Sequence, residues 1–300
     1  MTSASPFWDR VAGDHDFCCK VEEFIVCAEL LSIGDGQEMK ALSRIPFQGT
    51  ARALSVGGLN EVADKLALHP PAIWTVLSVE TSGCGFLPDR RPRILYERHI
   101  FHRLTHGKYD DGEISDPIAG GYGAPGAHQY DRLRLAMAQN RMAALQSCSW
   151  GIGQIMGENY AQAGFADVEQ MVAAMSESED RQLAAMGDFL IHFRLNVCLQ
   201  TQEWASFARG YNGANYAINR YDMRLKDAYR KYSAGPLPDL SVRAAQLYLT
   251  YLGFHPGALD GVARTRTLAA LADFRTQQGL ANTGPIDQDT IAQLSLALGD

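Results

Sequence analysis

The sequence predicts an α+β fold in which a predominantly helical domain carries a small β-region and is followed by a three-helix C-terminal domain. Helix-type spacing of apolar residues, together with helix-capping residues, occupies most of residues 50–232. Residues 83–126 interrupt this pattern, because they are rich in Gly, Pro and Asp and contain β-type fragments such as 93–97. A Pro- and Gly-containing stretch at 233–238 then ends a charged helical run and precedes a new apolar pattern.

These transitions divide the chain into four parts. We expect an N-terminal extension of unassigned role over 1–45, a larger domain over 46–232, a linker over 233–239 and a small domain over 240–300. At 300 residues, the chain is long enough for one medium and one small hydrophobic core.

Helix signals can be placed along the larger domain. The prolines at 70 and 71 can open a helix that runs to Glu80, and residues 131–148 have helical composition. Asp167 is a predicted N-cap, and Ser176 with Glu179 has the spacing of a capping box.

Composition and charge exclude several classes of protein. Hydrophobic residues make up 46% and charged residues 20%, the balance of a globular protein, and no apolar run approaches the length of a membrane helix. The net charge is −7 and no segment is strongly basic, so we expect neither a nucleic-acid partner nor membrane insertion. The N-terminus carries Asp9, Asp14 and Asp16 instead of a basic head, so no signal peptide is expected and synthesis should be cytoplasmic.

The cysteines and histidines give weaker indications. Six cysteines at irregular spacings favour reduced thiols over a disulfide framework. Cys84 and Cys148 could serve a Cys/His amidase, but neither opens a helix N-terminus that would lower a thiol pKa. His99, His102 and His106 lie close together without a carboxylate or Cys partner, so no metal or cofactor is expected. The sequence does not give the oligomeric state, and a monomer is the default expectation.

Glu80 continues an apolar face of the 71–80 helix. Residues at i, i+3, i+4 and i+7 share this face: Ile73, Val76, Leu77 and Glu80. Burial and the negative end of the helix dipole should both raise the pKa of the Glu80 carboxyl. A carboxylic acid that stays protonated near neutral pH can protonate a glycosidic oxygen. The alternative is a structural ion pair between Glu80 and a nearby arginine such as Arg90 or Arg93.

Two later clusters have the residue types of a saccharide site. Gly151 and Gly153 precede Gln154, so the backbone could approach a ligand while the amide side chain bonds to a sugar. Tyr211 and Asn212 end another predicted helix before a glycine, and an aromatic face with an amide can hold a pyranose ring. Each cluster alone is equally compatible with an ordinary loop or helix end.

In this order, the three clusters resemble the superfamily of lysozyme-type muramidases and soluble lytic transglycosylases. The sequence around these clusters, at 94–101, 120–123 and 149–157, resembles one family in particular, the N-acetylmuramidase domain of modular phage endolysins. The resemblance covers about residues 50–232 and implies a lysozyme-like domain that hydrolyses the β-1,4 bond between N-acetylmuramic acid and N-acetylglucosamine, with peptidoglycan glycan strands as the partner. A lytic transglycosylase forming 1,6-anhydro products and a non-catalytic wall-binding protein are the alternatives.

The resemblance also implies roles for single residues. It makes Glu80 the general acid. The substrate-binding residues that it implies are Gln154, Tyr211, Asn212, Gly151, Gly153 and Tyr130.

Glu97 is the candidate for a second carboxylate. It follows Glu80 by 17 positions and ends the β-type fragment that should face the cleft. A hydrolase could use it as a base for water or as an electrostatic stabiliser. A salt bridge with Arg93 is the equally weighted alternative.

The C-terminal part is predicted to form three helices over 241–252, 265–278 and 289–298. The text at 252–261, with Gly279 and Leu280, resembles the three-helix peptidoglycan-binding domain of cell-wall hydrolases. The resemblance implies wall binding, and we expect binding and chemistry to occupy separate cores.

Overall fold

The computed structural model describes residues 46–80, 83–214 and 216–299; the extension predicted over 1–45 lies outside the described residues. The α+β fold class is confirmed, with helices dominant, one small sheet and three C-terminal helices. Helices of the larger domain are α1 (Val56–Leu66), α2 (Pro70–Glu80), α3 (Arg98–Leu104), α4 (Gln129–Gln139), α5 (Arg141–Gln146), α6 (Val168–Glu177), α7 (Glu179–His192), α8 (Leu195–Gln200), α9 (Trp204–Asn212) and α10 (Tyr221–Ala234). In the parts of the chain described, no helix is long and apolar enough to cross a membrane.

The sheet is antiparallel in the order β1 (Ile94–Tyr96), β2 (Cys148–Trp150) and β3 (Ile155–Met156). Ile94 pairs with Trp150 and Trp150 pairs with Ile155. The predicted fragment at 93–97 is therefore a strand. The two other strands lie outside the β-region predicted over 83–126 and had no strand signal, because runs of two or three residues show no alternation.

Two predicted helix boundaries are wrong. Residues 131–148 do not form one helix, because Asn140 is extended and its side chain accepts a hydrogen bond from the Ala143 N–H, which starts α5. Ser176 does not cap α7, since it lies inside α6 and its hydroxyl bonds to the Val172 carbonyl. Ser178 caps α7 instead. Asp167 caps α6 as predicted.

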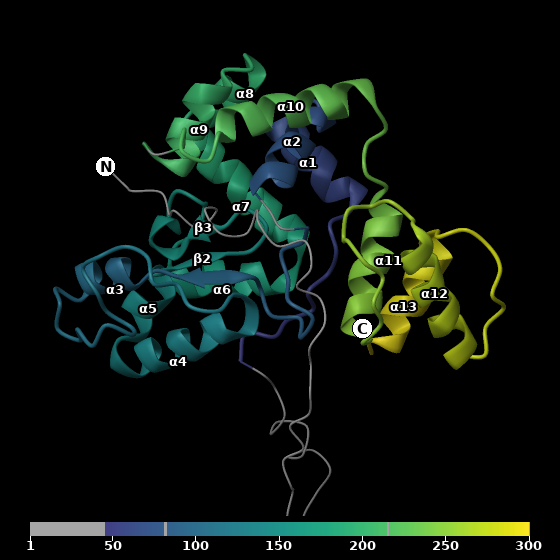
Figure 1. Ribbon diagram of the computed structural model, residues 1–300, viewed down its shortest axis with the longest axis horizontal. Coiled ribbons are helices and arrows are strands. Elements are labelled where there is room, and N and C mark those ends of the chain that lie inside the picture. Colours follow the sequence, from purple (N-terminus) through teal and green to yellow (C-terminus); the bar gives the residue numbers. More distant parts are fainter. Residues whose placement is uncertain (1–45, 81–82, 215, 300) are drawn as a thin grey trace, which may run out of the picture.

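The main core lies under α2 and reaches the sheet. In Figure 1, α8, α9 and α10 lie on one side of α1 and α2, the sheet and α3 to α6 form the opposite part, and α7 runs between the two. Eight of the eleven residues of α2 are buried, because other helices cover the helix on several sides. The end of α2 thus lies where the two parts of the domain meet.

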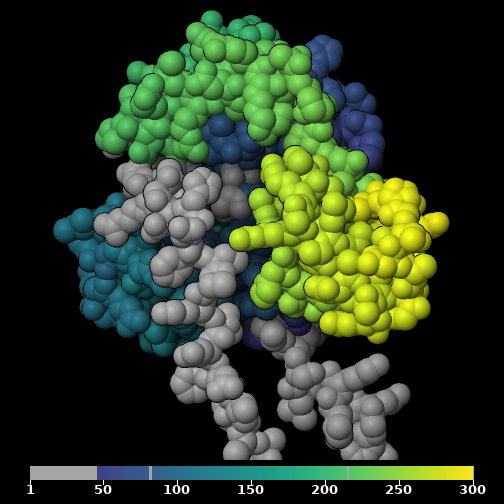
Figure 2. All heavy atoms as spheres, turned by 45° about the vertical axis from the view of Figure 1, so that its right-hand side comes forward, coloured from purple at the N-terminus to yellow at the C-terminus, as the bar shows by residue number. Residues whose placement is uncertain are grey.

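The C-terminal domain consists of α11 (Leu240–Tyr251), α12 (Thr265–Gln277) and α13 (Gln288–Ala297). Its core is a cluster distinct from the main core, but it includes Ala53 and Cys84 from the larger domain. Tyr251 donates a hydrogen bond to the Ala51 carbonyl at 3.0 Å, and Tyr248 accepts one from the Ala53 N–H at 3.3 Å. Figure 2 shows the C-terminal atoms (yellow) directly adjoining those of the α10 segment (green). The second core is thus distinct from the main core but includes two residues of the larger domain.

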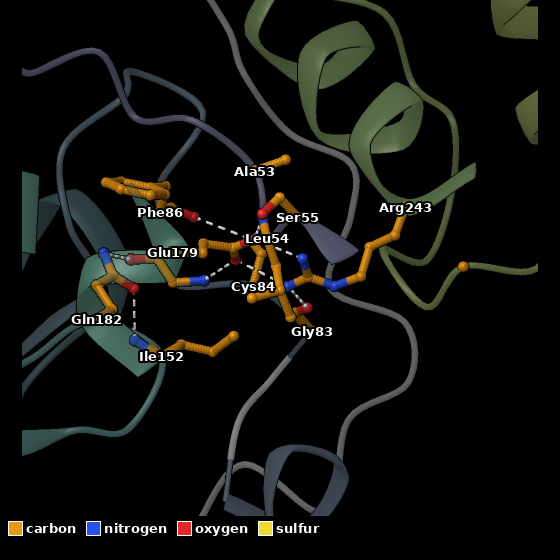
Figure 3. Close-up of polar contacts among 12 residues, drawn as sticks. Ala53, Leu54, Ser55, Gly83, Cys84, Phe86, Ile152, Glu179, Gln182 and Arg243 are labelled. Carbon is orange, nitrogen blue, oxygen red and sulfur yellow. Dashed lines mark hydrogen bonds and ion pairs between the residues drawn. The ribbon is translucent and has the colours of Figure 1, made fainter. Parts of the chain in front are cut away.

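A buried ion pair joins the two domains. The Glu179 carboxylate, at the start of α7, pairs with the Arg243 guanidinium of α11, and both side chains are almost wholly buried. Each carboxylate oxygen also accepts a backbone N–H at 2.8 Å, one from Leu54 and one from Gly85 (Figure 3). Burial raises the pKa of Glu179, but the charge and hydrogen bonds of Arg243 and the two N–H donors outweigh this and hold the pKa below its usual value. Glu179 is therefore ionised, and its four donors satisfy it.

Arg243→Met should destabilise the full chain strongly at pH 7, because it leaves the Glu179 carboxylate buried without its cation. We expect the free energy of unfolding to fall by about 3–5 kcal/mol, and adding Glu179→Gln to recover most of this loss. The midpoint of urea unfolding measures both effects. Because the pKa of Glu179 is lowered on folding, the contribution of the pair is present at neutral pH and is lost as the pH falls below about 4.5.

The matched control is Arg264→Met. Arg264 also belongs to the C-terminal domain and pairs with Asp260, but this pair is exposed and should contribute under about 1 kcal/mol. Equal midpoints for Arg243→Met and Arg264→Met would contradict a stabilising role for the buried pair.

Candidate active site

Glu80 is the last residue of α2, and its side chain is 1% exposed. The apolar residues of its stripe are equally buried, so the burial expected from their spacing is confirmed. The expected alternative, an ion pair with Arg90 or Arg93, is not formed: no arginine or lysine nitrogen of the described residues lies within 4.0 Å of the Glu80 carboxylate.

One neutral donor holds the Glu80 carboxyl. The Asn212 amide donates to Oε1 at 3.0 Å, while Oε2 is buried and has no hydrogen-bond partner among the described residues. Burial raises the pKa of Glu80 to about 7, against smaller lowering effects of the Asn212 hydrogen bond and the Arg224 charge. A carboxyl with this pKa is about half protonated at neutral pH, whereas an ordinary glutamate is almost fully ionised.

The end of α9 carries two of the sequence-predicted residues to this carboxyl. Tyr211 stacks on Phe207, with ring centroids 5.4 Å apart, and its hydroxyl donates to the Gly153 carbonyl at 2.6 Å. Burial, with a further contribution from nearby Glu80, raises the pKa of Tyr211 well above its usual value. The structure thus brings Glu80, Tyr211, Asn212 and the 151–154 turn together.

The 151–154 turn is built against α7. A Cβ on Gly151 would lie 2.6 Å from the Gln182 side chain, and one on Gly153 would lie 3.0 Å from Met186. The two glycines therefore permit a close approach to α7, a packing reason that the sequence interpretation of a ligand contact lacked. Gln154 adopts a positive φ of 47° and its amide bonds to the Gly151 carbonyl and to the Ser149 hydroxyl. In the structure, the Gln154 amide holds the turn in shape.

Glu97 directly follows β1 and is fully buried. Its N–H bonds to the Ser147 carbonyl at 2.8 Å, and its carboxyl oxygen Oε2 lies 3.2 Å from Nδ1 of His99. Among the described residues, His99 is the basic side chain within 4.0 Å of this carboxyl, and the expected pair with Arg93 is not formed. Its catalytic role stays a prediction.

Tyr130 and His102 make their contacts with other residues than those around Glu80. Tyr130 is buried, donates its hydroxyl to the Pro92 carbonyl at 2.8 Å and lies under the Arg91 guanidinium. These contacts give Tyr130 a packing role, and its part in substrate binding stays a prediction. His102 bonds to Asp110, and among the described residues no group of three His, Cys, Asp or Glu side chains is arranged to hold a metal ion.

Sequence reasoning missed three residues that shape this site. Arg224 of α10 donates to the Val79 carbonyl at 3.2 Å, next to the acid. Gln182 of α7 accepts from the Ile152 N–H at 2.7 Å, and Glu179 accepts from Gly85. Arg224 is one of several charges on an amphipathic helix, and Glu179 had the spacing of a capping residue, so neither carried a signal of its own.

Comparisons with known proteins give the family of each domain. A family model described as N-acetylmuramidase matches residues 69–233, and one described as a peptidoglycan binding domain matches residues 239–294. The crystal structure of a Burkholderia AP3 phage endolysin is similar, with 38% sequence identity and a TM-score of 0.56, over 65% of this chain and 75% of that chain. No curated protein matches the chain.

The raised pKa of Glu80 has a measurable effect on stability. Because the folded state holds this proton more tightly than the unfolded state, wild-type stability falls as the pH rises from about 4.5 to about 7. Glu80→Gln has no proton to lose, so its free energy of unfolding relative to wild type should increase by about 3 kcal/mol between pH 4 and pH 8.5. Urea unfolding across this pH range measures the difference.

Glu61→Gln is the control, because Glu61 lies exposed on α1. It shows what the loss of one exposed carboxyl does to the stability at each pH, and the Glu80→Gln result is compared with it. A difference between Glu80→Gln and wild type that does not change with pH would rule out a raised pKa at Glu80.

Proposed function

The chain belongs to the N-acetylmuramidase family, and we propose that Glu80 is the general acid of its reaction. The protein is a glycoside hydrolase of the peptidoglycan-cleaving, endolysin type. It acts on the β-1,4 bond between N-acetylmuramic acid and N-acetylglucosamine. The observation that carries the proposal is the environment of the Glu80 carboxyl: it is buried, its pKa is about 7 and its Oε2 atom accepts no hydrogen bond from the described residues.

In the proposed reaction, Glu80 protonates the glycosidic oxygen as the bond to the muramic acid carbon breaks. Proton transfer by a positioned acid of matched pKa contributes about 10²–10⁴ in rate, because it avoids the expulsion of an alkoxide. Positive charge then develops on the sugar ring, and water supplies the hydroxyl at the new reducing end. A pKa near 7 leaves about half of the enzyme with a protonated acid at neutral pH.

The residues around Glu80 are proposed to orient it and the saccharide. Asn212 holds Oε1, which turns Oε2 toward the reacting oxygen. Tyr211 fixes the 151–154 turn through the Gly153 carbonyl, so the turn and the end of α9 keep their distance from each other. Gln154, with Gly151 and Gly153, shapes the backbone that the sugar would meet.

Glu97 is proposed as the second carboxylate. A hydrolase that inverts would need it about 6.5–9.5 Å from Glu80, and one that retains about 5–5.5 Å. Its carboxyl is buried and lies beside His99, a fixed position that suits electrostatic stabilisation of the positive sugar ring better than activation of water from bulk solvent.

The C-terminal domain makes peptidoglycan the partner of the whole chain. Binding through α11 to α13 would keep the enzyme at an insoluble substrate between cleavage events, which raises the local concentration of glycosidic bonds. Cytoplasmic synthesis followed by release to the wall stays an expectation from the sequence.

Glu80→Gln is expected to lower hydrolysis of purified peptidoglycan at least about 100-fold, because the amide keeps the shape of the acid but has no transferable proton. The wild-type rate should fall as the pH rises through about 7, where Glu80 loses its proton. Release of reducing ends measures both. Glu61→Gln serves as the control, and a folded Glu80→Gln enzyme with wild-type activity would overturn the assignment.

Glu97→Gln should lower kcat about tenfold or more and leave KM nearly unchanged, because stabilisation of charge acts mainly in the transition state. His99→Gln separates this role from a structural one, since it removes the imidazole beside the Glu97 carboxyl but keeps the carboxyl itself. Equal losses in kcat for the two variants would reduce Glu97 to a structural partner of His99.

A further inference from the structure

Two arginines from different domains hold the chain on either side of Glu80. Arg224 of α10 donates to the carbonyl of Val79, the residue before the acid. Arg243 of α11 donates through Nη2 to the carbonyl of Gly83, three residues after it, at 2.9 Å. The second arginine belongs to the domain that binds the wall, so the chain around the acid is fixed in part by the other domain.

We propose that Arg243 is a positioning residue for the reaction: the wall-binding domain, through Arg243, holds the segment that follows Glu80 and thereby fixes the acid. This inference rests on the proposed role of Glu80.

The contacts at Gly83 are well defined. Gly83 has a positive φ of 106°, and a Cβ on it would lie 3.6 Å from the Cβ of Leu259 in the C-terminal domain. The adjacent Cys84 belongs to the core of that domain. Gly83 therefore takes a backbone shape that only glycine adopts freely, and it does so against residues of the wall-binding domain on two sides.

The Arg243 guanidinium also connects this segment, through α7, to the 151–154 turn. Nη2 also donates to Glu179, whose carboxylate accepts the Gly85 N–H. One turn further along α7, Gln182 donates to the Gly85 carbonyl at 3.4 Å and accepts from the Ile152 N–H. Ile152 lies in the turn whose Gly153 carbonyl bonds to Tyr211. A chain of hydrogen bonds thus runs from Arg243 to Glu179, through the Gly85 backbone to Gln182, and on to the 151–154 turn (Figure 3).

Loss of the Arg243 contact with Gly83 is expected to lower the pKa of Glu80. The ionisable groups that face Glu80 are Tyr211 from α9 and Arg224 from α10, and the hydrogen bonds of Arg243 go to Glu179 and Gly83 instead. The raised pKa of Glu80 comes mainly from burial. If the backbone at Gly83 is no longer held, we expect Glu80, three residues earlier, to become less completely buried, so the pH at which activity is lost should fall.

The test uses the full chain and soluble, uncross-linked glycan strands, which the enzyme can cleave without holding a sacculus. Arg243→Lys keeps a charge beside Glu179 but has one nitrogen in place of the two that Arg243 uses, so it cannot reproduce the planar fork between Glu179 and Gly83. We expect kcat to fall about tenfold with KM changed less than twofold, and the alkaline limb of the kcat profile to move to lower pH. The double variant Glu179→Gln with Arg243→Met, which leaves no buried lone charge, should show the same changes.

Arg275→Lys is the matched control. Arg275 is also a buried arginine of the C-terminal domain, but it bonds to Pro285 and Thr290 within that domain. It should leave kcat and the alkaline limb at wild-type values. A wild-type kcat and limb in both folded Arg243 variants would overturn the inference, and so would equal changes in Arg275→Lys. An active Glu80→Gln would instead overturn the proposed function, whatever the Arg243 variants do.

Discussion

Four donors converge on the carboxylate of Glu179, and the arrangement of the whole chain depends on that convergence. Two are nitrogens of Arg243, and the others are the backbone N–H groups of Leu54 and Gly85. A carboxylate with no exposure is stable only when its charge and its lone pairs are all satisfied. The start of the larger domain, the segment after α2 and the C-terminal domain must therefore all meet at the start of α7.

The protein holds two buried carboxyls in opposite states, and the difference lies in their donors. Glu179 has a guanidinium and two backbone N–H groups, so its pKa is low and it carries a charge. Glu80 has one neutral amide and a less direct cation, so burial prevails and its pKa rises to about 7. The ionised carboxyl joins the two domains, and the other, which is about half protonated at neutral pH, is the proposed acid. The Gly83–Gly85 segment lies close to both, since it follows Glu80 and bonds to Arg243 and Glu179.

The sequence by itself determined the fold class, the position of β1, the burial of Glu80 and the family. These features rest on local patterns: the apolar stripe of α2, the Asp167 cap and the order of three short motifs along the chain. Local patterns survive folding because each depends on residues within one or two helical turns. The role of Glu97 was open in the sequence, and its burial beside His99 now defines the experiment that tests it.

Only the tertiary structure decided which distant residues act together. Glu179 and Arg243 are 64 positions apart, and Glu179 had the spacing of a capping residue, so nothing local marked it as the centre of a buried network. The same holds for Gly151 and Gly153, whose lack of a side chain is explained by Gln182 and Met186 on α7. Contacts between residues far apart in the chain leave no periodic pattern in the sequence, so they could not be predicted from it. Burial turns an ordinary Glu or Arg into a constraint only after folding has excluded water and brought its partner within reach.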